Sequence, residues 1–97
     1  MRIAYTERAL ADLRAISAYL KPRSPGGAKN VRNAIGSTIS HLAAFPQLGR
    51  LQSAPGVYKI NVRKYPYLIY YTFDRITGTI TIVTIRHGFQ QREFDDA

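Results

Sequence analysis

Cysteine and tryptophan are absent from this 97-residue sequence, and histidine occurs only twice. Without cysteine the chain can form no disulfide and no thiolate metal site, and His41 and His87 are too far apart in sequence to indicate a zinc site. No apolar run approaches the roughly 20 residues of a membrane-spanning helix, and the N-terminus lacks the apolar core of a signal peptide. We therefore expect a cytoplasmic protein with no metal, no cofactor and no membrane contact.

Acidic residues are also scarce. The chain has 6 acidic residues against 14 lysines and arginines, which gives a formal net charge of +8 and a pI of about 10.2. No acid occurs from Leu13 through Phe73, a span that holds nine basic residues. Such a body attracts polyanions or an acidic protein. Nucleic acid, the ribosome and an acidic binding protein are all compatible partners.

Most enzyme signatures are missing as well. The sequence has no P-loop, no glycine-rich nucleotide loop and no serine hydrolase motif, and six acids leave little for a paired-carboxylate hydrolase. The chemistry that remains is metal-independent RNA cleavage, in which a histidine or tyrosine moves protons and arginines stabilise charge on the phosphate. If the chain is a nuclease, its candidate catalytic residues are Arg63, Arg86 and His87. A strand-end histidine such as His87 is also compatible with a structural role.

Three stretches in the second half of the chain have the character of β-strands. Residues 57–63 alternate polar and apolar side chains, 67–73 are apolar on both faces, and 79–86 are almost wholly β-branched. Gly78 and Pro66 fall between these stretches, where turns tolerate positive φ or a missing N–H. We expect a three-stranded antiparallel meander, and the β-branched run argues against a mainly helical protein.

Two helices are predicted before the meander, over residues 7–21 and 25–45. Thr6 and Ser24 are typical N-caps, and apolar side chains follow at helical spacing in both segments. We interpret Gly36, inside the second helix, as a point where the first helix approaches closely.

The order of these elements predicts one α+β domain over residues 1–97. The helical hairpin covers one face of an antiparallel sheet, to which residues 2–5 add a fourth strand at one edge. Residues 47–56 are expected to form a loop. Residues 93–97, which hold three of the six acids, are expected to form a flexible tail.

Side-chain parity in the central strand suggests a contact surface. Tyr67 and Tyr71 share parity with Ile69 and are expected in the core, whereas Leu68 and Tyr70 point to the opposite face. If the helices cover only one face, Leu68 and Tyr70 form an exposed apolar strip inside a basic rim. Such a strip is a candidate site for a partner segment.

Three segments resemble, in order, parts of one known superfamily. Phe45-Pro46 with Leu48-Gly49-Arg50 resembles a loop after the second helix, residues 63–71 resemble a central-strand motif with Pro-Tyr and aliphatics, and residues 82–88 resemble a final strand ending in histidine and a small residue. Together they resemble the ParE/RelE superfamily of toxins from bacterial type II toxin–antitoxin systems. Pro-Tyr-Leu-Ile and Ile-Arg-His-Gly look closer to ParE, although many ParE members carry an arginine where Tyr58 stands here.

The resemblance implies a toxin that a cognate antitoxin neutralises, with Leu68 and Tyr70 as candidate antitoxin contacts. ParE-like members bind and poison DNA gyrase, whereas RelE-like members cleave messenger RNA on the ribosome. We expect gyrase inhibition by binding, with RelE-like cleavage as the alternative and a nucleic-acid-binding module as the competing class. The target-binding candidates are Arg50, Lys59, Arg63, Lys64 and Arg86.

Overall fold

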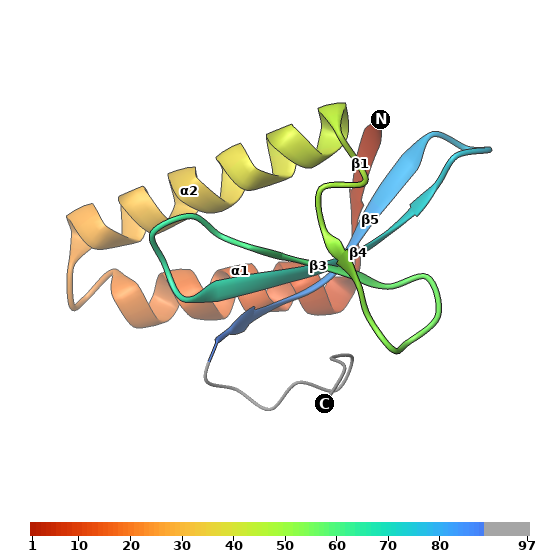
Figure 1. The fold of residues 1–97 in the computed structure, drawn as a ribbon. Coiled ribbons are helices and arrows are strands. Elements are labelled where there is room, and N and C mark those ends of the chain that lie inside the picture. The colour runs from red at the N-terminus through yellow and green to blue at the C-terminus, as the bar shows by residue number, and fades with distance from the viewer. Residues whose placement is uncertain (89–97) are drawn as a thin grey trace.

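The computed structural model describes residues 1–88, so the predicted tail over 93–97 lies outside the described residues. Five strands form one mixed sheet in the order β1-β5-β4-β3-β2, and two helices form an antiparallel hairpin against it (Figure 1). The helices are α1, Glu7–Leu20, and α2, Pro25–Ala44. The strands are β1, Arg2–Tyr5; β2, Arg50–Leu51; β3, Tyr58–Asn61; β4, Tyr67–Asp74; and β5, Thr79–His87.

The predicted α+β class and helical hairpin are confirmed, but the predicted sheet is wrong in two respects. Arg50–Leu51, expected within a loop, pairs antiparallel with β3 and makes a fifth strand. β1 lies at the predicted edge but runs parallel to β5, so the sheet is mixed. Parallel pairing is possible here because α1, α2 and the next three strands separate β1 from β5 in the chain.

Local side-chain chemistry explains where the helices begin. The Thr6 hydroxyl accepts a hydrogen bond from the Ala9 N–H at 3.0 Å, and the Ser24 hydroxyl accepts one from the Gly27 N–H at 3.0 Å. These bonds satisfy first-turn amides that have no helical partner. The Thr6 hydroxyl also donates to the Val83 carbonyl at 2.6 Å. The cap of α1 is therefore also a link to β5.

The main core lies between the helical hairpin and one face of the sheet. Its helical side is formed by Ala9, Val31, Ile35, Ile39 and Leu42. Its sheet side includes fully buried Ile69 and Tyr71, and Tyr67 packs against it, as parity predicted. A β-bulge opposite Tyr70 and Tyr71 shifts the register of β5, so Ile82 and Ile85 both face this core.

Gly36 does not mark a close helix approach. The residue is exposed, and a Cβ built on it would meet no atom within 4 Å. The interpretation of Gly36 as a packing glycine is therefore wrong. A close approach occurs instead at Gly49, where a Cβ would collide with the Tyr71 hydroxyl and lie 2.9 Å from the Lys59 carbonyl oxygen.

Asp12 replaces the partner that β5 lacks beyond the end of β1. Its carboxylate accepts hydrogen bonds from the Ile85 N–H at 3.0 Å and from the Thr84 hydroxyl at 2.5 Å. Thr84 is fully buried, so its hydroxyl has no access to water. The Asp12 side chain of α1 therefore provides a hydrogen-bond acceptor for β5 at the positions beyond the end of β1.

Candidate functional site

Four of the five predicted target-binding cations lie around the turn that joins β3 to β4. Arg50 and Lys59 are directly paired across the β2–β3 ladder, so their side chains leave the same face of the sheet. Arg63 and Lys64 lie in the turn and are exposed. Lys64 has a φ of 73°, a left-handed conformation that costs a non-glycine residue roughly 1–2 kcal/mol.

Two hollows flank this turn. The first, which we call the turn groove, has a volume of about 520 Å³ and lies between α2 and the turn. Its walls include Asn30, Asn33, Ser37 and His41 from α2 and Arg63 and Lys64 from the turn. The second, the sheet pocket, has a volume of about 390 Å³ and includes Lys59 and Asn61. Lys64 and Tyr65 line both hollows, so the turn separates two cationic depressions.

The α2 wall of the turn groove was not identified from the sequence. Sequence reasoning gave His41 no function and did not single out the two asparagines. The available signal was their spacing, because polar residues at positions 30, 33, 37 and 41 share one face of a helix. The helical pattern does not reveal which other element lies opposite that face, because this depends on the tertiary structure.

Arg86 does not belong to the exposed cationic surface. Its side chain is 7% exposed, and it pairs across the β4–β5 ladder with Leu68. The other four cations are exposed or half-buried. The expectation that Arg86 contributes to a surface for binding a target is therefore wrong in this structure.

The three candidate nuclease residues do not converge. Arg86 and His87 are consecutive in β5, so their side chains leave opposite faces of the strand. The His87 ring packs edge-on against Tyr67 with the ring centroids 5.5 Å apart. Arg63 lies in the turn, beside α2. Acid–base cleavage needs proton-transfer groups and cations around one phosphate, and Arg86 and His87 point to opposite faces of β5 instead.

Leu68 and Tyr70 do not form an exposed strip. They do face away from the helices, but Leu68 is 7% exposed and Tyr70 is fully buried. They form a second, smaller core with Val57, against which Ala54 and Val83 pack. The loop between β2 and β3 therefore covers the second sheet face, and the prediction of Leu68 and Tyr70 as exposed antitoxin contacts has lost its basis.

Tyr71 fixes the loop between α2 and β2. Its hydroxyl donates to the Pro46 carbonyl at 2.8 Å and accepts from the Gly49 N–H at 2.8 Å. Burial raises the pKa of Tyr71, while the hydrogen bond from Gly49 acts in the opposite direction. Tyr58, at the position where many ParE members carry an arginine, stacks on Tyr71 with the ring centroids 5.6 Å apart. The aromatic ring at this position therefore covers the core.

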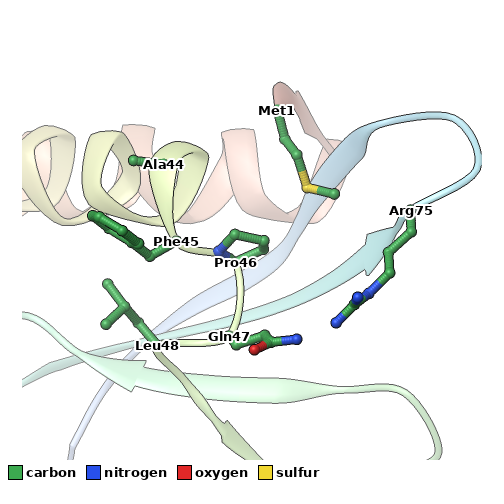
Figure 2. A pocket seen from close by; sticks show the side chains of 7 residues that line it. All are labelled: Met1, Ala44, Phe45, Pro46, Gln47, Leu48 and Arg75. Carbon is green, nitrogen blue, oxygen red and sulfur yellow. The ribbon is translucent and has the colours of Figure 1, made fainter.

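An exposed apolar surface lies beside this loop. Phe45 and Leu48 are 64% and 53% exposed, and they border a pocket of about 470 Å³ that Met1 and Arg75 also line. Figure 2 shows Phe45 and Leu48 on one side of the loop and Arg75 extending toward it from the β4–β5 turn. This pocket borders the β4–β5 turn and the turn groove borders the β3–β4 turn, and the two turns lie at opposite ends of β4.

Within residues 1–88, no three histidine, cysteine, aspartate or glutamate side chains come close enough to hold a metal ion. Neither of the helices in this part of the chain combines the length and the apolar character that crossing a membrane requires.

Comparison with known proteins adds two relatives of known fold. The solved structure of a chromosomal ParDE toxin–antitoxin system from P. aeruginosa matches with a TM-score of 0.76 at 24% identity, over 90% of this chain and 95% of that one. The intact E. coli RelBE toxin–antitoxin complex matches with a TM-score of 0.69 at 19% identity, over 94% of this chain and 98% of that one. These likenesses show that the fold is shared.

Comparison of sequences identifies the family to which the chain belongs. Toxin RelE2 of Caulobacter vibrioides is 38% identical over 88 residues, which is 90% of this chain and 94% of that protein. The family model described as the ParE toxin of the type II toxin–antitoxin system parDE matches residues 3–92. The match takes in both helices and all five strands apart from Arg2, so this chain belongs to the ParE toxin family.

Proposed function

We propose that this single-domain toxin acts in the cytoplasm by binding and inhibiting DNA gyrase. The observation that carries the proposal is the ParE family match over residues 3–92. A binding mechanism needs a shaped surface and no catalytic constellation. Arg50 and Lys59, paired across β2 and β3, and Arg63 and Lys64, exposed in the β3–β4 turn, supply the cations of such a surface. We assign target binding to these four residues and leave the buried Arg86 out.

RNA cleavage on the ribosome is the second candidate. It is favoured by the 38% identity to a relative named RelE2 and by the fold shared with RelBE. The opposite orientations of Arg86 and His87 on β5, and the burial of Arg86, speak against it, because cleavage would require these groups around one phosphate.

We also propose that an acidic antitoxin neutralises this chain. The ParDE and RelBE structures are of toxin–antitoxin pairs, and a net charge of +8 favours an acidic partner. The exposed Phe45 and Leu48 replace Leu68 and Tyr70 as our candidate apolar contacts, because an antitoxin segment that folds on binding gains from burying apolar surface.

Controlled expression in bacteria tests the proposal. We expect growth arrest that is relieved when the reading frame immediately upstream is co-expressed. Plasmid from arrested cells should lose negative supercoiling, while messenger RNA stays intact and His87→Ala arrests growth as wild type does. Messenger RNA cut within codons, with cutting abolished by His87→Ala, would establish the nuclease in place of the gyrase inhibitor.

A further inference from the structure

The turn groove has the composition of a site for a phosphate-bearing strand. From α2 it receives two amide side chains, a hydroxyl and an imidazole, and from the turn it receives the exposed cations Arg63 and Lys64. None of the residues that line it is acidic. The nearest acids in sequence are Asp12 and Asp74, and Asp12 is committed to β5. The positive charge of the groove is therefore not neutralised by its own walls.

The α2 wall is built on one helical stripe. Asn30, Asn33, Ser37 and His41 fall within roughly 80° of arc at 3.6 residues per turn, and the stripe is roughly 16 Å long at ~1.5 Å per residue. At the ~3.4 Å per nucleotide of a fully stacked strand, this length accommodates at most about five nucleotides. All four side chains of this stripe are exposed, so a ligand can reach them.

The backbone at Lys64 is a second, independent observation. Its φ of 73° is a conformation that glycine or asparagine adopts more cheaply than lysine. Residues held in such conformations cluster at binding and active sites, so the backbone at Lys64 is consistent with a binding role. Lys64 stands at the ridge between the turn groove and the sheet pocket, with Tyr65 beside it. Tyr65 packs half-buried against the main core and also lines the groove, so part of its ring is accessible beside the Lys64 charge.

We propose that the turn groove binds a single strand of nucleic acid. Arg63 and Lys64 neutralise backbone phosphates, the asparagines offer donors and acceptors to sugar or base edges, and Tyr65 offers a ring on which a base stacks. A peptide would gain little here, because the exposed wall of α2 is polar and the apolar surface lies elsewhere, at Phe45 and Leu48. The inference does not depend on gyrase as the target.

Fluorescence anisotropy with the purified full chain tests this inference. The probes are labelled oligonucleotides of about 12 nucleotides, longer than the groove, as single-stranded DNA, single-stranded RNA and duplex DNA. We expect single strands to bind more tightly than duplex, and the ratio of DNA to RNA affinity identifies which strand the groove prefers. Each phosphate neutralised contributes about −0.7 to the slope of log K against log salt for a single strand.

Matched double variants separate the groove from net charge. Arg63→Gln with Lys64→Gln should weaken binding roughly tenfold and reduce the slope by about 1.4. Lys29→Gln with Arg32→Gln removes the same charge from exposed residues of α2 that do not line the groove, and the slope should stay at the wild-type value. Lys64→Asn should weaken binding without lowering the melting temperature, because asparagine tolerates positive φ.

Four results would overturn the inference. The first is no measurable binding of any oligonucleotide, and the second is an equal loss of affinity in the two double variants. The third is an affinity for duplex DNA as high as for single strands. The fourth is displacement of the bound oligonucleotide by polyglutamate as effectively as by an unlabelled strand of similar length. The last result would identify a site for an acidic peptide. No gyrase is present in these reactions, so their failure leaves the proposed gyrase inhibition standing, and failure of gyrase inhibition leaves strand binding to be judged separately.

Discussion

At the scale of single residues, the Tyr71 hydroxyl is the clearest determinant of stability. It bridges the Pro46 carbonyl and the Gly49 N–H from the centre of the sheet. Tyr71→Phe leaves both groups without this partner, and we expect the free energy of unfolding to fall by about 1–3 kcal/mol in urea titration. Tyr19→Phe is the control, because Tyr19 is 59% exposed and its change should stay within about 0.5 kcal/mol. Equal effects of the two variants would contradict the role of Tyr71.

The same hydroxyl predicts how stability depends on pH. Burial raises the pKa of Tyr71 above its usual value of 10.0, so the folded state holds the phenol proton more tightly than the unfolded state. The stabilisation is complete below the unfolded pKa and is lost as the pH rises through the folded pKa. The difference in unfolding free energy between wild type and Tyr71→Phe should therefore shrink above about pH 10. A difference that grows in this range would contradict the assignment.

The sheet face on which a residue lies was easier to predict than whether that residue is buried. Parity placed Leu68 and Tyr70 on the face away from the helices, and their cluster with Val57 agrees with that. Their burial depends on the loop between β2 and β3, whose sequence has no periodicity from which a cover could be inferred. Arg86 was misjudged for a related reason, since a charged side chain suggests exposure unless its neighbours are known.

At the scale of elements, Gly36 weakens α2 without a packing reward. Because a Cβ at this position meets nothing within 4 Å, Gly36→Ala should raise the free energy of unfolding by about 0.5–1 kcal/mol in thermal or urea denaturation. Gly27→Ala is the matched contrast, since its Cβ would lie 2.8 Å from the Ser24 hydroxyl that caps the helix. If Gly27→Ala stabilises the protein as much as Gly36→Ala does, helix propensity alone governs both sites.

Asp12 determines how firmly α1 holds β5. Asp12→Ala removes the acceptor of the Ile85 N–H and of the buried Thr84 hydroxyl, and we expect a loss of about 2–3 kcal/mol. Hydrogen exchange at the Ile85 amide should accelerate more than exchange in the rest of β5. Glu7→Ala removes an exposed acid from the same helix and should cost less than about 1 kcal/mol. Unchanged exchange at Ile85 would show that the contact is dispensable.

Helices and strands with a clear hydrophobic period were predicted to within two residues at each end. The helices expected over 7–21 and 25–45 are Glu7–Leu20 and Pro25–Ala44. β2 was missed because a strand of two residues has no period. The direction of β1 was missed because four residues show that a strand forms and do not show how it pairs.

At the scale of the whole molecule, the turn groove and the apolar pocket beside Phe45 and Leu48 border different turns, one at each end of β4. Arg63 and Lys64 are exposed in the β3–β4 turn, and the pocket beside the exposed Phe45 and Leu48 is bordered by Arg75 of the β4–β5 turn. The sequence predicted a basic body and the ParE/RelE resemblance. It did not predict this division, because the apolar surface belongs to a loop and the cationic groove needs α2 and the turn together. Two separate surfaces allow a target and an antitoxin to use different parts of one small toxin.

Supercoiling of relaxed plasmid by purified gyrase is the most direct test of the central claim, because the reaction contains no ribosome and no messenger RNA. We predict that the purified chain abolishes supercoiling in a dose-dependent manner and that His87→Ala inhibits as strongly as wild type, since inhibition by binding needs no proton transfer. Full supercoiling in the presence of a large excess of folded toxin would contradict the account.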